Sequence, residues 1–269
     1  MTVQTLAPAR SGTLAPRPIR TLAALGDSTV VGVGDPLPGG GWRGFPTLLR
    51  DAVGADLLNT GRTGARMADV RNLQLPAAVA ARPEAAVVCA GMNDTLRSDF
   101  DPAGIQRDLA AVLRALHGVG SHPVVLRYHD HTQVFRLPHR LRAALRARVA
   151  ALNTAIDGAV QGTGEPGATG VLDLHRLPGG YERTAWSVDR LHPSEQGHRL
   201  LARGTAELYR AAGFAVPGEV RLECAGGREV TALHRGAWIV VKGTPWLVRR
   251  GRDLGPVILR GLLDGDRAR

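Results

Sequence analysis

The chain has 269 residues, of which 44% are hydrophobic and only 4% aromatic, and its formal net charge is +10 at pH 7. This length allows one large α/β domain, or one domain with an appendage, and the apolar content argues against global disorder. The basic charge comes almost entirely from scattered arginines, without a dense tract or interleaved aromatic residues. Nucleic acid is therefore not an expected partner.

The first 213 residues alternate between short apolar runs and longer amphipathic segments. Buried strands are predicted at Arg20–Leu25, Asp56–Asn59, Ala85–Ala90, Pro123–Tyr128 and Gly170–Leu174. Amphipathic helices are predicted at Gly44–Val53, Ile105–Leu116, Leu137–Val160 and Ser194–Ala212. Strands separated by helices of this length predict an α/β fold with a five-stranded parallel sheet and right-handed crossovers.

We expect residues 18–215 to form this domain, with a flexible tail at 1–17 and a small C-terminal extension at 216–269. Within the extension, Arg221–Cys224 and Ala237–Val241 could form short strands, and the pattern of Trp246–Leu263 predicts a broken amphipathic helix. The segment 246–263 is basic and apolar and could contact a membrane surface. Its glycines and proline weaken a free helix, so packing on the domain or on a protein partner is favoured.

Compartment and cofactor chemistry can also be inferred from the sequence. The two cysteines, Cys89 and Cys224, have neither metal-ligand spacing nor the number needed for a disulfide framework. No signal peptide is visible, and no stretch is long enough to span a membrane. These features predict a cytoplasmic protein.

Polar residues follow the first three predicted strands. Ser28 comes after the first strand, Asn59 and Gly61 after the second, and Asn93 after the third. Ligands of open parallel sheets bind at the carboxyl ends of the strands, so these residues should meet at one edge.

A serine hydroxyl needs a base within hydrogen-bond reach, and that base needs an orienting group. His192, with Asp189 three residues before it, supplies both for Ser28. The N–H groups of Ser28 and Gly61 and the side-chain amide of Asn93 are the candidate donors of an oxyanion hole. Taken alone, Ser28 could equally be an ordinary N-cap or turn serine.

Other residues near the expected site have less specific signals. Trp42 and Arg62 are placed near the predicted mouth, where each could contact substrate or simply face solvent. His129 and His131 follow the fourth strand and could bind a metal, but no further ligand is evident, so a role in lining the substrate pocket is favoured. No metal and no cofactor are expected.

The sequence resembles the SGNH/GDSL hydrolase family, and within it mostly actinobacterial members. Four blocks carry the resemblance, namely Gly26-Asp27-Ser28, Gly61, Gly91-Met92-Asn93-Asp94 and Asp189-Arg190-Leu191-His192. It covers about Thr21 to Gly213, and the leucine that gives the family its name is Thr29 here. The resemblance implies a flavodoxin-like three-layer α/β/α fold and metal-independent hydrolysis of a small-molecule ester or thioester.

The leading hypothesis is thus a serine esterase that forms an acyl-enzyme on Ser28, with His192 as general base and Asp189 orienting it. A thioesterase or acyltransferase would use the same residues. A non-catalytic binding or membrane-surface module is the remaining alternative, because residues 216–269 lie outside the resemblance.

Overall fold

A computed structural model describes residues 15–134, 139–164 and 167–228 of the chain. Its strands are β1 (Thr21–Gly26), β2 (Asp56–Asn59), β3 (Ala85–Cys89), β4 (His122–Arg127) and β5 (Gly170–Asp173). Its α-helices are α1 (Ser28–Val31), α2 (Gly44–Val53), α3 (Met67–Asp69), α4 (Leu75–Ala81), α5 (Met92–Thr95), α6 (Pro102–Gly118), α7 (His139–Gln161) and α8 (Glu195–Ala211). A π-helical turn covers Val70–Gln74, and 3-10 turns cover His131–Gln133 and Arg183–Ala185.

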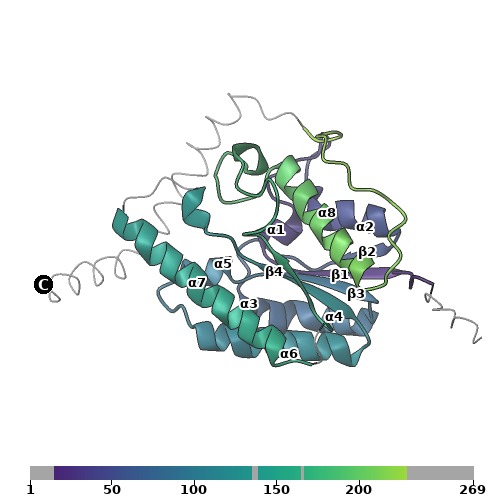
Figure 1. Ribbon diagram of the computed structural model, residues 1–269, viewed down its shortest axis with the longest axis horizontal. Coiled ribbons are helices and arrows are strands. Elements are labelled where there is room, and N and C mark those ends of the chain that lie inside the picture. Colours follow the sequence, from purple (N-terminus) through teal and green to yellow (C-terminus); the bar gives the residue numbers. More distant parts are fainter. Residues whose placement is uncertain (1–14, 135–138, 165–166, 229–269) are drawn as a thin grey trace, which may run out of the picture.

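The strands form a five-stranded parallel sheet in the order β2-β1-β3-β4-β5. Helices α2 and α8 pack together on one face of the sheet, and α6 and α7 pack together on the other (Figure 1). This strand order is that of flavodoxin-like sheets, and its switch point lies between β1 and β3. The predicted three-layer α/β fold is confirmed.

The predicted helices and strands match the observed ones to within a few residues because local signals mark their ends. Helix α8 begins after Ser194, whose hydroxyl accepts a hydrogen bond from the N–H of Gly197 at 3.2 Å. Helix α6 starts earlier than predicted, at Pro102, because proline suits the first helical turn.

The helical segment from Met67 to Ala81 was not predicted. A buried glutamine, Gln74, interrupts its apolar pattern. The amide of Gln74 accepts from the N–H of Gly26 at 2.7 Å and donates to the carbonyl of Gly26 at 2.9 Å. This side chain therefore bonds to both backbone groups of Gly26, two residues before Ser28.

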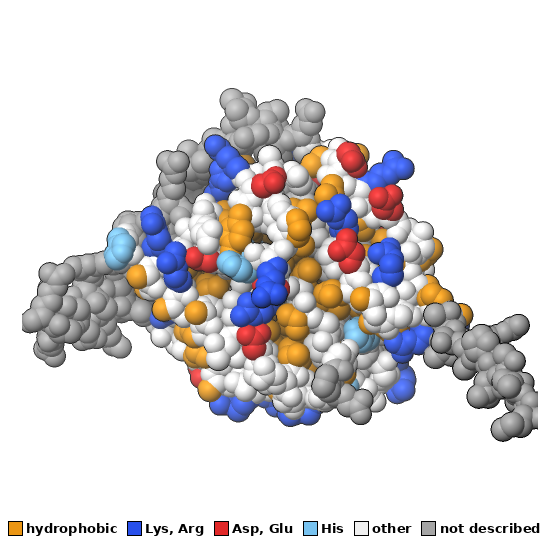
Figure 2. All heavy atoms as spheres, in the orientation of Figure 1, with side chains coloured by type: hydrophobic (Ala, Val, Ile, Leu, Met, Phe, Trp, Pro, Cys, Tyr) orange, Lys and Arg blue, Asp and Glu red, His pale blue; other side chains and the backbone are white. Residues whose placement is uncertain are grey.

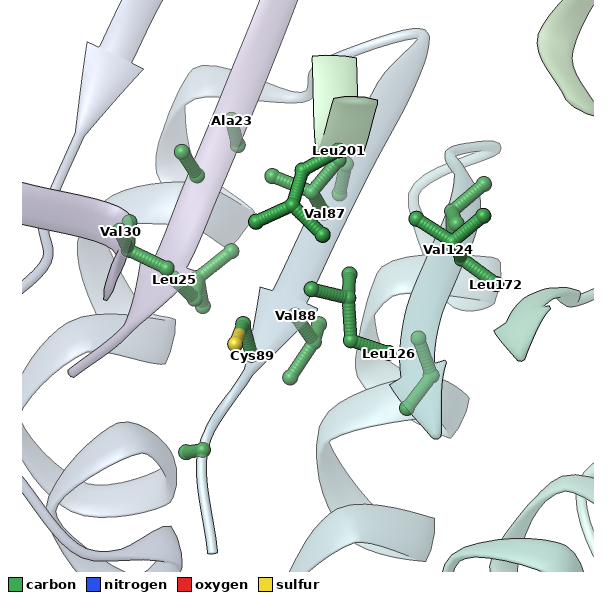
Figure 3. Close-up of a cluster of buried hydrophobic side chains, with 14 of the residues drawn as sticks. Ala23, Leu25, Val30, Val87, Val88, Cys89, Val124, Leu126, Leu172 and Leu201 are labelled. Atoms are coloured by element: carbon green, nitrogen blue, oxygen red, sulfur yellow. The ribbon is translucent and has the colours of Figure 1, made fainter. Parts of the chain in front are cut away.

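The core lies between the sheet and its helices and consists mainly of aliphatic side chains. Figure 3 shows part of it, where Leu25 and Val30 from the first βα unit lie near Val88 of β3. Leu126 of β4 and Leu201 of α8 belong to the same cluster. Because the central strand β3 is buried on both faces, its sequence is a continuous apolar run.

Residues 216–228, which we call the C-terminal strap, run along α2 and α8. Gly218 donates its N–H to the carbonyl of Ala52 at 2.8 Å, and Arg228 donates its N–H to that of Pro36 at 2.8 Å. The predicted strand at Arg221–Cys224 is wrong, because these residues have no regular structure. The segments Ala237–Val241 and Trp246–Leu263 lie outside the described residues.

The strap is attached through a cluster of charged side chains. The carboxylate of Glu195 lies 2.7 Å from Arg43 and 2.9 Å from Arg199, and it accepts from the N–H of Ala225 at 2.6 Å. Arg43 also pairs with the fully buried Asp35 at 2.9 Å.

The segment before β1 is held just after the end of α8, where Arg17 donates its N–H to the carbonyl of Gly213 at 2.9 Å.

The visible surface of Figure 2 carries basic side chains at separate places, interspersed with acidic and apolar ones. Within the described residues, no helix combines the length and apolar character needed to cross a membrane.

Candidate active site

Ser28 is the first residue of α1 and lies at the carboxyl end of β1. The turn into the helix is sharp: Gly26 has φ +150°, and a Cβ there would lie 2.0 Å from the carbonyl oxygen of Cys89, which only glycine avoids. Asp27 caps the helix by accepting from the N–H of Thr29 at 2.9 Å. Ser28 is 8% exposed and is one of the residues that line a pocket.

His192 and Asp189 complete a chain of hydrogen bonds with Ser28. The Nε2 atom of His192 lies 2.8 Å from the Oγ atom of Ser28, and its Nδ1 atom lies 2.6 Å from the Oδ2 atom of Asp189. Burial alone would raise the pKa of Asp189, but hydrogen bonds and the nearby His192 lower it below its usual value. The carboxylate is therefore held in its charged form.

The turn that carries Asp189 and His192 is fixed by its own hydrogen bonds. The Oδ1 atom of Asp189 accepts from the N–H of Leu191 at 2.9 Å, the N–H of His192 at 3.0 Å and the hydroxyl of Ser187 at 3.0 Å. Arg190 between them has φ +56°, a left-handed conformation that is uncommon for a residue with a side chain. The side chain of Asp189 thus both shapes this turn and orients the histidine.

Two of the three predicted oxyanion donors lie at the pocket. Asn93 lines it from α5, and its amide donates to the carbonyl of Ala65 at 3.1 Å. The N–H of Ser28 is at the first position of α1, where helices leave N–H groups without intrahelical partners.

Gly61 is placed differently from this expectation. Its N–H donates to the Oδ1 atom of Asn59 at 3.0 Å, and Gly61 is not among the residues that line the pocket. The Nδ2 atom of Asn59 donates to the carbonyl of Val30 at 2.9 Å. Asn59 therefore joins the Gly61 loop to the end of α1.

The pocket at Ser28 is mostly apolar and extends toward α8. Leu126, Leu174, Leu177, Leu200 and Leu201 contribute to its wall. Of the three predicted substrate-contacting residues, His129 lines the pocket. Trp42 is 42% exposed and Arg62 is exposed, and neither is a lining residue.

Several features of the site were missed by the sequence analysis. The apolar wall from α8 and Trp186, which both line the pocket, were not among the predicted site residues. The roles of Gln74 and Ser187 depend on contacts with Gly26 and Asp189. The apolar face of α8 was the one available signal, but periodicity does not distinguish a core wall from a pocket wall.

Burial dominates the electrostatics beside Ser28. It raises the pKa of Asp27 to about 6, even though hydrogen bonding to Thr29 and the nearby His192 act in the opposite direction. It lowers the pKa of His129 to about 3 and that of His131 to about 4. Both imidazoles are therefore neutral near pH 7.

Known proteins share a sequence family and a fold with this chain. The model of the GDSL-like Lipase/Acylhydrolase family matches residues 24–200, a range that contains Ser28, Asn93, Asp189 and His192. No curated protein sequence shows a significant match to the chain.

Solved structures of similar fold include a lipase from a goat rumen metagenome, with 19% identity, a TM-score of 0.56, and 75% of this chain and 100% of that one covered. A psychrotrophic esterase from Pseudoalteromonas has 15% identity and a TM-score of 0.54, with coverages of 72% and 98%. An acetyl-xylooligosaccharide esterase variant from Geobacillus has 16% identity and a TM-score of 0.54, with coverages of 73% and 96%. At these identities the similarity shows a shared fold.

Proposed function

The chain belongs to the GDSL-like lipase/acylhydrolase family and is a hydrolase of ester bonds, and we propose that it cleaves a carboxylic ester through an acyl-enzyme on Ser28. The observation that carries the proposal is the continuous chain of hydrogen bonds from Ser28 through His192 to Asp189. Its distances of 2.8 and 2.6 Å are those that a nucleophile, its base and an orienting acid require.

In the first half-reaction, the Oγ atom of Ser28 attacks the ester carbonyl carbon while Nε2 of His192 takes its proton. Asp189 stabilises the imidazolium that forms. Collapse of the tetrahedral intermediate breaks the bond to the leaving alcohol, which takes the proton from His192.

The second half-reaction releases the acid. A water molecule gives a proton to His192 and attacks the acyl-enzyme carbonyl. The bond to Oγ then breaks, the proton returns to Ser28, and the carboxylic acid leaves.

The oxyanion requires hydrogen-bond donors, and we propose the N–H of Ser28 and the amide of Asn93 for this role, because both residues line the pocket. The predicted contribution of Gly61 would require its N–H to exchange the bond to Asn59 for one to the oxyanion. Gly64 in the same loop precedes Ala65, whose carbonyl accepts from Asn93. We therefore propose Gly64 as an alternative backbone donor.

A short p-nitrophenyl ester provides the direct test. Ser28→Ala should abolish turnover, and brief incubation of the unaltered protein with a fluorophosphonate should add one covalent label at Ser28. Ser121→Ala is the matched control, because Ser121 is also buried but lies just before β4, at the opposite edge of the sheet. Retained activity in Ser28→Ala would contradict the proposal.

A thioester or an acyl acceptor other than water would use the same serine, histidine and aspartate. Matched ethyl esters and thioesters of one acyl group, assayed with and without an added alcohol, separate these reactions. Faster release from the thioester, or transfer to the alcohol, would identify a thioesterase or an acyltransferase.

A further inference from the structure

One buried histidine that the proposed mechanism does not use lies between the segments that carry Ser28 and His192. His198 is on α8, which begins shortly after His192, and its side chain is fully buried. Its Nδ1 atom lies 3.2 Å from the backbone nitrogen of Phe45, and its Nε2 atom lies 3.1 Å from the carbonyl oxygen of Val33. Both ring nitrogens of His198 are therefore bonded to the backbone of segments that follow Ser28 in the chain.

The two backbone partners fix the tautomer of His198. The N–H of Phe45 can only donate, so Nδ1 of the ring accepts and carries a lone pair. The carbonyl of Val33 can only accept, so Nε2 carries the proton. Burial lowers the pKa of His198 to about 4, although the bond to Val33 and the charge of Asp35 act in the opposite direction. The ring is therefore neutral near pH 7 and keeps both hydrogen bonds.

Val33 connects this histidine directly to the proposed nucleophile. It lies in the turn after α1, and its N–H donates to the carbonyl of Ser28 at 3.0 Å. Val33 is thus bonded to Ser28 through its N–H and to His198 through its carbonyl. Because α1 has only four residues, a shift of this turn moves Ser28 as well.

Phe45 connects the other ring nitrogen of His198 to α2. The two rings are nearly parallel, with 6.3 Å between centroids and 9° between planes. Helix α2 packs on α8, and α1 packs on α2 (Figure 1). The junction of α1 and α2 is so close that a Cβ on Gly32 would lie 2.8 Å from the Cα of Gly44. The bond to Phe45 therefore reaches Ser28 only through α2, whereas the bond to Val33 reaches it directly.

We propose that His198 is a positioning residue whose Nε2 proton, through Val33, fixes the Ser28 turn relative to the segment that carries His192. The inference rests on the proposed function in one respect, namely that Ser28 and His192 are the nucleophile and its base. The distance that His198 maintains is the 2.8 Å between the Oγ atom of Ser28 and the Nε2 atom of His192. A misplacement of about 1 Å between such groups can reduce the rate about 10²-fold.

Two amide substitutions separate the two hydrogen bonds of His198. The side-chain oxygen of asparagine extends about as far as Nδ1 of histidine, so His198→Asn keeps an acceptor for Phe45 and loses the donor to Val33. The amide nitrogen of glutamine extends about as far as Nε2, so His198→Gln keeps that donor and loses the acceptor. Each variant is neutral and loses one hydrogen bond, so a merely structural role predicts similar kcat values for both.

Steady-state kinetics with a p-nitrophenyl ester test the positioning role. His198→Asn should lower kcat by about 10–100-fold with little change in KM, because the lost contact positions the reacting groups. His198→Gln should restore kcat to within a few fold of the parent value. A kcat for His198→Gln that is no higher than that of His198→Asn, or an effect confined to KM, would overturn the inference.

His117→Asn is the matched control for these variants. His117 lies on α6 and also bonds through Nε2, to Thr169 at 3.0 Å, outside the lining of the Ser28 pocket. This variant loses a histidine hydrogen bond of the same kind and should keep the kcat of the parent.

A spectroscopic measurement separates this inference from the proposed reaction, because it needs no turnover. In NMR spectra with nitrogen-labelled histidine, Ser28→Ala should shift the Nε2 resonance of His192, since it removes the hydrogen bond between them. The same substitution should shift that resonance much less when it is combined with His198→Asn, because the pair is then already apart. An equal shift in both backgrounds would overturn the inference alone. No shift in the parent would show that Ser28 and His192 do not pair, which would contradict the proposed function and the inference together.

Discussion

The Nε2 atom of His192 lies 2.8 Å from the Oγ atom of Ser28, although 164 residues separate the two in the chain. The loops that carry these two residues touch where Gly34 packs against Pro193. The approach is so close that a Cβ on Gly34 would lie 1.9 Å from the Pro193 carbonyl oxygen, so only glycine fits there. The packing of α8 on α2 brings the two loops to the same side of the sheet. The site is therefore assembled by the packing of one face of the domain.

Asp189→Asn should lower kcat by about 10³–10⁴-fold while the protein remains folded. The Oδ1 position accepts three hydrogen bonds from the turn, so the asparagine oxygen should remain there. Its NH₂ group would then face Nδ1 of His192 and favour the tautomer that carries its proton on Nε2, which cannot act as the base. Steady-state kinetics test this, with Asp51→Asn on the exposed side of α2 as control. Near-normal kcat would show that Asp189 does not orient His192.

Asn59→Ala should reduce kcat by roughly 10-fold with little change in KM, because a lost positioning contact affects the transition state more than substrate binding. The variant removes both hydrogen bonds that join α1 to the Gly61 loop. Asn59→Asp keeps an acceptor for the N–H of Gly61 but cannot donate to Val30, so its kcat should fall less. Equal kcat values for all three proteins would show that this link does not position the site.

Asp27→Asn should stabilise the protein at alkaline pH. Burial raises the pKa of Asp27 from 3.8 to about 6, so the folded state binds this proton more tightly than the unfolded state does. Stability is therefore lost as the pH rises from about 4 to about 6, and the cost persists above that range. The asparagine removes the charge and still accepts from Thr29, so its unfolding free energy should exceed that of the parent by roughly 1–3 kcal/mol at pH 8.

The measurement for Asp27→Asn is urea unfolding at pH 4 and at pH 8. Near pH 4 the two proteins should differ much less, because the parent carboxyl is then protonated when folded. A stability difference that does not depend on pH would contradict the role assigned to this carboxyl.

Glu195→Gln should lower the unfolding free energy by about 1–3 kcal/mol, because it leaves two largely buried arginines without their shared carboxylate. Its effect should appear in stability and in protease sensitivity near Ala225, since the strap is attached there. Glu207→Gln on the same helix is the control, because its side chain is 63% exposed. Similar losses in both variants would show that the cluster does not anchor the strap.

The order and type of the main helices and strands follow from local patterns in the sequence. Apolar periodicity and the Ser194 cap act within a few residues, so they identify α6 and α8 without knowledge of the fold, although the start of α6 at Pro102 was missed. The Met67–Ala81 segment escaped prediction because Gln74 is buried by hydrogen bonds to a strand far away in the chain. The predicted strand at Arg221–Cys224 failed because the carbonyl of Arg221 accepts a hydrogen bond from the side chain of Arg199 on α8, and no neighbouring strand pairs with the segment among the described residues.

Neighbouring residues in the chain are enough to reveal the family blocks, the α/β alternation and the local pairing of Asp189 with His192. The contact between Ser28 and His192, the hydrogen bond from Gly61 to Asn59 and the place of His129 in an apolar pocket are visible only in the folded domain. These relationships depend on side-chain directions and on contacts between segments far apart in the chain. Such contacts exist only once the helices have packed on the sheet.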